Sequence, residues 1–510
     1  MPMRLLLALV VGLGLIAPAA AADTYLVERG VARAQIVIAE QPPRSVRLAA
    51  QELQDYVEKI TGAHLPIVTK PEPGQVYVYV GSSEHTKRLG ITAAGFKDGA
   101  YRIVSGDNYL VLIGHDSDFT PIEPWAPNNG AIRSGKLQQD WEAITGELWG
   151  VPNGGMYKNR MRLPAETGLP DAERATAKNQ PPLGLWTYDE RGSFNAVCGF
   201  LRKLGVRWYA PGEVGEVVPS TKTIRLPQID ETVQPAFPIR RISLRLATHS
   251  RDVAMWALRL GMRDPYGIGV AHGMATMTGR DEVYAKYPEW FALYGGERRY
   301  IPGSSKNQLC YSNEQLFEHT VRWVRAQLDT YKYEAVSVMP PDGYSAVCQC
   351  PECQAKATPQ RDRRGLASDY VWEFVNRVAK EVAKTHPDAK ILNCAYGIYW
   401  LPPEKIEKLE PNVAVSIVGG RRPLADRPEE KAELARIRAA WAEKSSHPII
   451  IFENYPLTDR GWYLPAFAWR SIGEGINAIK GVSQGEDIWC SAPLERQAKA
   501  GRYQPRSVRG

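Results

Sequence analysis

The sequence predicts an α/β protein in two parts: an N-terminal α/β sandwich-like domain and a C-terminal (β/α)8 barrel of the TIM type. Three observations lead to this prediction. Strand-like and helix-like segments alternate in the first part, and seven apolar β runs separated by helical stretches follow residue 236. No glycine-rich phosphate-binding turn follows the first of these runs. Such repeated alternation is typical of a parallel sheet, and seven or eight units favour a barrel over an open doubly wound sheet.

Residues 1–22 have the composition of an export signal. Arg4 supplies a positive charge, residues 5–16 form an apolar stretch, and small residues precede an expected cleavage site near Ala22. The apolar stretch is too short to span a bilayer. We therefore expect a periplasmic or secreted chain that has no membrane association after the signal is cleaved.

The composition indicates a large globular protein, with 44% hydrophobic and 23% charged residues. The net charge of +7 is concentrated in part in an atypical basic tail, residues 494–510. The rest of the chain is nearly balanced, so we expect no nucleic-acid partner. The 14 Trp and 24 Tyr supply aromatic faces that can stack on sugar rings.

Local patterns define the elements of the N-terminal domain, residues 23–235. Apolar positions three or four residues apart predict a helix over residues 44–60, and Gly62 ends it. Pro, Gly, Asn and charged residues over 120–182 predict a long loop insertion. The expected strands are residues 34–39, 76–81 and 109–114.

The barrel domain is expected over residues 236–493. Its expected strands are residues 239–246, 268–277, 335–339, 391–395, 413–418, 449–452 and 478–482. Its clearest helices are residues 316–331, 368–385 and 428–444. Because the tail after residue 493 has almost no aliphatic side chains, an eighth strand is missing and the barrel is expected to be incomplete at its C-terminal end.

Two groups of motifs resemble known families. "LAAQELQDYVEKITGAHLPIV" (48–68) and "GSFNAVCGFLRKLGVRWYAPGEVGEVVP" (192–219) resemble the domain that precedes the barrel in α-glucuronidases and β-hexosaminidases. "YPEWFALYGGERR", "QLCYSN", "VSVMPPDGYSAVCQCPEC" and "SDYVWEFVNRVAKEV" resemble the barrel of exported bacterial DUF4838-type proteins, some of which are assigned as endo-β-N-acetylglucosaminidases. The resemblance implies a glycoside hydrolase with an oligosaccharide or glycan substrate. An α-glucuronidase-type hydrolase and a non-catalytic glycan-binding protein remain alternatives.

Three acidic residues are candidates for catalysis because each is expected where a barrel strand ends. Asp342 follows the third expected strand, Glu453 the sixth, and Glu486, next to Asp487, the seventh. Most glycoside hydrolases use two carboxyl groups, one to protonate the leaving oxygen and one to support positive charge at the anomeric carbon. In the acetamido-assisted variant, we assign Glu486 as general acid, with Asp342 or Glu453 assisting.

The same strand ends carry candidate substrate-binding residues. Aromatic residues at a barrel mouth can form a wall for sugar stacking and lower the local dielectric. A basic residue there can bind a sugar hydroxyl or carboxylate. The candidates are His272, Tyr344, Tyr396, Trp400 and Arg245.

Four cysteines are expected to gather near Asp342. Cys348, Cys350 and Cys353 form C-x-C-x-x-C, and Cys310 lies shortly before this unit. Four thiolates suit a closed structural zinc site, and four cysteines in an exported chain suit two disulfides equally well. Either would fix the loop that carries Asp342. Catalysis itself is expected to need no cofactor.

Overall fold

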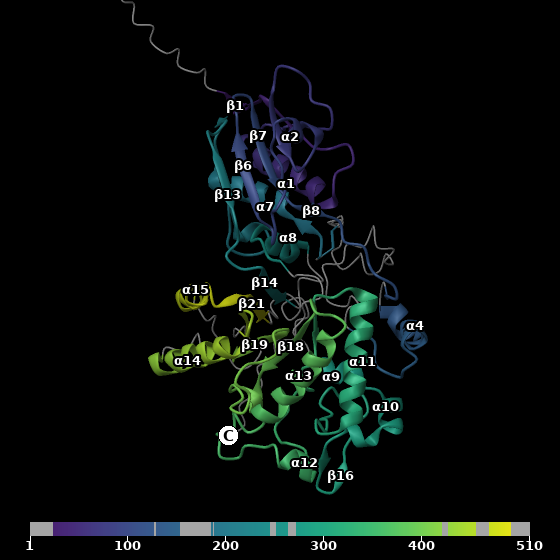
Figure 1. The fold of residues 1–510 in the computed structure, drawn as a ribbon. Coiled ribbons are helices and arrows are strands. Elements are labelled where there is room, and N and C mark those ends of the chain that lie inside the picture. The colour runs from purple at the N-terminus through teal and green to yellow at the C-terminus, as the bar shows by residue number, and fades with distance from the viewer. Residues whose placement is uncertain are drawn as a thin grey trace, which may run out of the picture.

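The computed structural model describes residues 24–126, 129–152, 185–186, 188–244, 251–263, 272–420, 427–454 and 469–490. They form two lobes, one above the other in Figure 1, and the fold class predicted from the sequence is confirmed: a sheet domain precedes an incomplete TIM-type barrel. Residues 1–22 and 494–510 lie outside the described ranges. Within those ranges, no helix combines the length and apolar composition needed to cross a bilayer.

The first lobe contains a six-stranded sheet in the order β13-β6-β7-β5-β3-β4. Its strands are β3 (Ala34–Val37), β4 (Ile67–Val68), β5 (Val76–Val80), β6 (Tyr101–Ser105), β7 (Tyr109–Gly114) and β13 (Asp230–Val233). Helices α1 (Arg44–Thr61) and α7 (Gly192–Lys203) pack together and share a core with it. Gly62 ends α1 in the left-handed conformation, and its N–H donates to the Glu58 carbonyl, as predicted.

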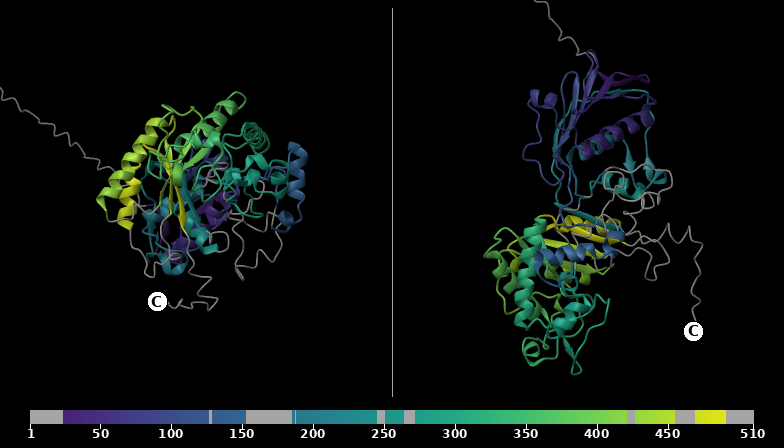
Figure 2. Two further views of the ribbon diagram at one scale, coloured as in Figure 1. Left: turned by 90° about the horizontal axis from the view of Figure 1, so that it is seen from below. Right: turned by 90° about the vertical axis from the view of Figure 1, so that its right-hand side faces the viewer.

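The second lobe contains a six-stranded parallel sheet in the order β14-β21-β20-β19-β18-β17. The strands are β14 (Ile239–Leu244), β17 (Ala335–Ser337), β18 (Lys390–Ala395), β19 (Val413–Gly420), β20 (Ile449–Asn454) and β21 (Ser483–Cys490). Helices α11 (Glu314–Tyr331), α13 (Ser368–Ala383), α14 (Pro428–Lys444) and α15 (Trp469–Ala478) connect them. In Figure 2 these helices line one side of the curled sheet.

Smaller elements complete the lobes. Short strands are β1 (Tyr25–Glu28), β2 (Val31–Ala32), β8 (Asp116–Ser117), β9 (Glu190–Arg191), β10 (Arg207–Trp208), β11 (Glu216–Val217), β12 (Ile224–Arg225), β15 (Leu293–Tyr294) and β16 (Glu297–Arg298). Short helices are α2 (Glu84–Arg88), α3 (Asn129–Arg133), α4 (Lys136–Thr145), α8 (Arg251–Arg259), α9 (Gly273–Thr278), α10 (Asp281–Lys286) and α12 (Pro351–Gln354).

The two faces of the barrel sheet have different surroundings. Alternate residues such as Ile417 and Ile451 belong to the large core shared with the helices. Their neighbours Ala414 and Ile450 belong to a separate small cluster with Ile239, on the inner face. Since successive side chains of a strand point to opposite faces, this division separates the helix side from the lumen along the regular parts of the described strands.

Three sequence predictions need correction. Residues 273–277 were expected to be strand and form α9 instead, whereas residues 268–271 lie outside the described ranges. Residues 478–482 end α15 and form a turn, so β21 begins only at Ser483. The expected loop over 120–182 contains α3 and α4.

The hydrophobic cores do not follow the boundary expected at residue 236. Trp141 on α4 stacks on Tyr331 of α11 at a ring-centroid distance of 6.0 Å and lies in the barrel core. Conversely, Met255 and Leu258 on α8 follow residue 236 in the chain but lie in the core of the first lobe. Each lobe therefore completes its core with a segment from the other side of that boundary.

An ion-pair cluster anchors α8 to the first lobe. Arg259 Nε donates to Glu52 Oε1 at 2.5 Å, and its Nη1 donates to Glu216 Oε1 at 2.7 Å. The Glu52 side chain is only 5% exposed. The guanidinium also lies over the Tyr56 ring, 5.2 Å from its centroid. Arg259 is thus the cation that compensates a buried carboxylate where α8 packs on the first lobe.

We predict that Arg259→Ala lowers the free energy of unfolding by about 3–5 kcal/mol, because it leaves Glu52 as an uncompensated buried charge. Urea unfolding followed by circular dichroism measures this loss. The matched control is Arg102→Ala, which breaks the solvent-exposed pair with Asp230 and should leave the unfolding midpoint nearly unchanged. Equal effects of the two substitutions would contradict the anchoring role.

Candidate active site

Asp342 lies at the carboxyl edge of the barrel sheet, in contact with two other polar side chains. Its Oδ1 is 3.4 Å from the Tyr396 hydroxyl, which donates to it, and 3.6 Å from His272 Nε2. The Asp342 and His272 side chains are 40% and 31% exposed. Three candidates that are far apart in the sequence therefore meet at one accessible point, at the edge where barrel enzymes place their working groups.

The hydrogen bonds of His272 indicate which ring nitrogen carries the proton. Nδ1 lies 2.6 Å from the Pro340 carbonyl, which can only accept, so the neutral ring carries its proton on Nδ1. Nε2 then carries a lone pair and faces Asp342 Oδ1 across 3.6 Å, slightly more than a hydrogen-bond distance.

Short-range contacts fix the Asp342 loop and the His272 segment. The Gly343 N–H donates to Asp342 Oδ1 at 2.7 Å, with Gly343 at φ 72°, and Gln308 Nε2 donates to the Asp342 carbonyl at 2.8 Å. Next to His272, the Met274 N–H donates to the Met339 carbonyl. A Cβ on Gly273 would lie 1.7 Å from the Ser337 carbonyl oxygen, so only glycine permits this approach to β17.

A second carboxylate faces the lumen. Asp487 Oδ2 accepts from Arg241 Nη1 at 2.7 Å, and Asp487 is 2% exposed. The two residues are register partners on β21 and β14, and Asp487 is also paired with Phe452 on β20. These three side chains share the inner face with Ile239 and Ile450.

Cys394 and Ser416 lie on the inner face of the sheet, on the two strands between β17 and β20. They are register partners on β18 and β19. Burial raises the pKa of Cys394 to about 12, and the charge of Asp487 contributes in the same direction. Burial likewise raises the pKa of Tyr399 well above its usual value, with contributions from Cys394 and Asp342. Asp487 thus influences Cys394 on the inner face, whereas Asp342 influences Tyr399 in the helix-side core.

Glu453 and Glu486 lie on the other face of the sheet. Both were expected just beyond strand ends, but Glu453 lies within β20 and Glu486 within β21. Glu453 is fully buried and accepts from Arg438 Nη2 of α14 at 2.8 Å. Glu486 is paired with Ile451, whose side chain belongs to the helix-side core. The structure therefore groups these two carboxylates with each other, away from Asp342 and Asp487.

The expected sugar-binding residues fall into two groups. His272 and Tyr396 are partly exposed and form an edge-to-face pair, with ring centroids 6.2 Å apart. Tyr344 and Trp400 are buried, 3% and 4% exposed, and Trp400 Nε1 donates to the Val418 carbonyl. They belong to the core beneath the loops and are not accessible to a substrate. Arg245 lies outside the described residues.

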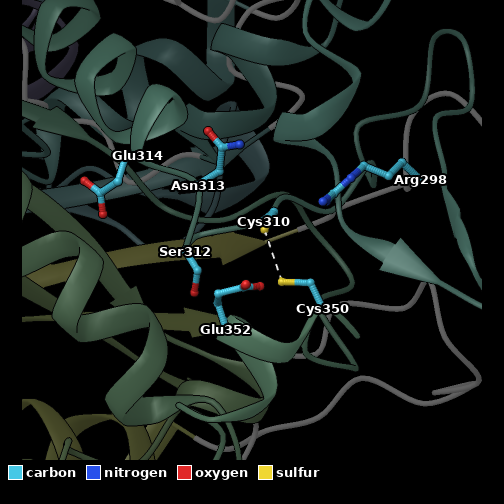
Figure 3. A pocket seen from close by; sticks show the side chains of 7 residues that line it. All are labelled: Arg298, Cys310, Ser312, Asn313, Glu314, Cys350 and Glu352. Carbon is cyan, nitrogen blue, oxygen red and sulfur yellow. Dashed lines mark hydrogen bonds between the residues drawn. The ribbon is translucent and has the colours of Figure 1, made fainter.

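The four cysteines come together, with their sulfur atoms all within 4.8 Å of one another. All are buried and none is in a disulfide. Two of them, Cys310 and Cys350, line a shallow pocket of about 310 Å³ beside Arg298, as Figure 3 shows. The cluster follows the Asp342 loop in the chain and is a separate feature from the carboxylate site.

The sequence pattern gave no separate role to Arg241, Ser416 and Cys394. Cys394 is buried in the structure. The available signal was strand parity: on one strand, residues two apart share a face. Applied to β21 in its observed register, this rule separates Asp487 from Glu486.

Comparison with known proteins gives a family and several distant structural likenesses. The model of the family described as "Domain of unknown function (DUF4838)" matches residues 209–458, which confirms the resemblance drawn from the barrel motifs. No curated protein matches the chain.

Similar solved structures include a family GH115 4-O-methyl-α-glucuronidase with specificity for decorated arabinogalactans, at 12% identity and a TM-score of 0.42. That match covers 91% of this chain and 55% of the other, so this chain spans about half the length of that enzyme. A Streptomyces plicatus N-acetyl-β-hexosaminidase matches at 12% identity and a TM-score of 0.38, covering 92% and 83% of the two chains. A GH138 enzyme targeting pectin rhamnogalacturonan II matches at 10% identity and a TM-score of 0.35. That match covers 90% of this chain and 58% of the other.

We predict that Gly273→Ala destabilises the barrel lobe by at least about 1–3 kcal/mol, since the added methyl group must push the His272 segment away from the backbone of β17. Thermal unfolding measures the loss. The matched control is Gly473→Ala in α15, where a Cβ meets nothing within 4 Å and should stabilise the helix by about 1 kcal/mol. An unchanged melting temperature for Gly273→Ala would show that His272 is not held in this way.

Proposed function

We propose that the protein is a glycoside hydrolase that acts on oligosaccharide or glycan substrates at the carboxyl edge of the half-barrel. The observation that carries this proposal is the contact of the exposed Asp342 with His272 and Tyr396 at that edge. Glycoside hydrolysis needs a carboxyl group that can deliver a proton to the leaving oxygen. The resemblance of the barrel motifs to proteins with this activity points the same way.

The surroundings of the two lumen-side carboxylates suit different tasks. Asp487 is buried against the guanidinium of Arg241, and an adjacent cation favours the ionised form of a carboxyl group. Asp342 instead lies next to His272 at the accessible edge of the sheet, where a leaving oxygen can reach it. In this proposal Asp342 is the general acid, and the negative charge of Asp487 supports the positive charge that develops at the anomeric carbon.

The reaction balances with these groups alone. The bond between the anomeric carbon and the leaving oxygen breaks, its electron pair goes to that oxygen, and the proton held by Asp342 passes to it. Water then adds to the anomeric carbon, and its proton returns to Asp342. The 3.6 Å separation of Nε2 and Oδ1 is slightly longer than a hydrogen bond, as is common in the absence of substrate.

The sugar class is a further part of the proposal. An N-acetylglucosaminide is favoured by the barrel motifs, through their resemblance to endo-β-N-acetylglucosaminidases. An α-glucuronide would require basic groups for the uronate carboxylate, and Arg241 is already paired with Asp487. The signal-like residues 1–22 support action outside the cytoplasm.

The test is product analysis with aryl N-acetylglucosaminides, aryl α-glucuronides and N-glycans. We predict hydrolysis by the wild type and a loss of about 10²–10⁴-fold in kcat for Asp342→Asn, because the amide cannot donate the proton. Asp342 is exposed, so the substitution should leave the melting temperature unchanged.

The matched control is Asp329→Asn, which removes another His–Asp contact, with His386, on an exposed part of α11. It should retain full activity. Glycan binding without product release by the wild type would instead identify a non-catalytic binding protein. An activity that survives Asp342→Asn but not Glu486→Gln would return the acid role to Glu486.

A further inference from the structure

The sulfur atoms of Cys310, Cys348, Cys350 and Cys353 have the spacing of a metal tetrahedron. Cys310 Sγ is 3.5 Å from Cys353 Sγ and 3.7 Å from Cys350 Sγ, and the four atoms lie within 4.8 Å of one another. A tetrahedron with zinc–sulfur distances of about 2.3 Å has sulfur atoms about 3.8 Å apart. A disulfide would require about 2.05 Å. The observed grouping thus leaves room for one ion at its centre.

Two of the four sulfurs have a hydrogen-bond partner from outside the set. The Leu293 N–H donates to Cys348 Sγ at 3.2 Å. Thiolates are far better acceptors than thiols, so donors aimed at sulfur atoms are the supporting contacts that a metal–thiolate site needs.

The second sulfur has a side-chain partner. The Tyr370 hydroxyl lies 2.9 Å from Cys353 Sγ, and Arg298 lines the same pocket as Cys310 and Cys350. Four thiolates and one divalent cation carry a net charge of −2, and Arg298 supplies a positive charge at the edge of the cluster, as Figure 3 shows. The positive charge of Arg298 therefore offsets part of the negative charge of a metal–thiolate cluster.

We propose that these four cysteines bind one zinc ion in a closed structural site. Four thiolates in a tetrahedron leave no open position for a substrate, so the ion has no part in the chemistry. The site joins the segment at Cys310 to the loop that follows β17, which also carries Asp342. The proposal is independent of the proposed hydrolase activity, because it concerns metal content alone.

The chain needs such a link because the loop has little regular structure. Between the end of β17 and α12 the described chain contains no helix or strand. Besides the buried side chains of Tyr344 and Val347, its ties are single hydrogen bonds, such as those from Tyr294 Oη to the Ala346 carbonyl and from the Gln349 N–H to the Leu293 carbonyl. A metal ion bound by Cys310 on one segment and by the three loop cysteines on the other would fix the position of the loop more firmly than these hydrogen bonds.

Metal analysis of the full-length protein, purified without chelator or reductant, tests the proposal. We expect about one zinc per chain, and replacement by cobalt(II) should give the intense visible bands of a tetrahedral thiolate complex. After unfolding in chelator, all seven cysteines should titrate as thiols without reductant. Iron in place of zinc, or four cysteines that titrate only after reduction, would overturn it.

Cys353→Ser should lower the zinc content to a small fraction of the wild-type value. The matched control is Cys198→Ala, which alters a buried cysteine in the core of the first lobe and should keep the full zinc content. If Cys353→Ser does not fold, the metal content and cobalt spectrum of the wild type still decide the question. Hydrolysis assays are read separately, so failure of either proposal leaves the other standing.

Discussion

The two-residue period of the parallel strands determines which side chains of the second lobe can meet a substrate. Helices cover one face of the sheet, so a carboxylate on that face lies in the packed interior while its neighbour in sequence faces the lumen. Glu486 and Asp487 illustrate this constraint. A shift of one residue in β21 would exchange them and would remove Asp487 from Arg241, its partner on β14. The register of one strand therefore decides which acid is available.

The two sides of the candidate site are held by different kinds of structure. Asp487 and Arg241 belong to regular strands, so the sheet positions them. Asp342 and His272 lie beyond the regular elements and depend on close backbone approach at Gly273, hydrogen bonds to the loop and the cysteine cluster. Loops on a rigid scaffold are the usual carriers of function, and here the loop needs its own anchors because no strand or helix extends to it.

Much of the fold follows from local sequence, and the failures have identifiable causes. The helices over residues 44–61, 314–331, 368–383 and 428–444 were predicted to within a few residues because apolar spacing and end signals agree. The last strand was misplaced because Ala478, Ile479 and Val482 are apolar yet belong to the end of α15 and the turn after it, whereas β21 begins with Ser-Gln-Gly-Glu-Asp. Polar residues suit a strand whose inner side lines a lumen. A search for apolar runs alone cannot find such a strand. Cysteine spacing identified the four-residue set but left metal and disulfide equally open.

The two lumen-side acids also differ in what they contribute to the fold. The Asp487–Arg241 pair joins the first and last described strands of the sheet, across 246 residues of sequence, and both partners are largely buried. Loss of that carboxylate would leave an arginine without its buried partner, so a fall in activity would be mixed with a fall in stability. Asp342 is exposed and contacts its partners only through a loop. Substitution of Asp342 can therefore change activity without changing stability. For this reason Asp342 is the better residue on which to test the assignment of the general acid.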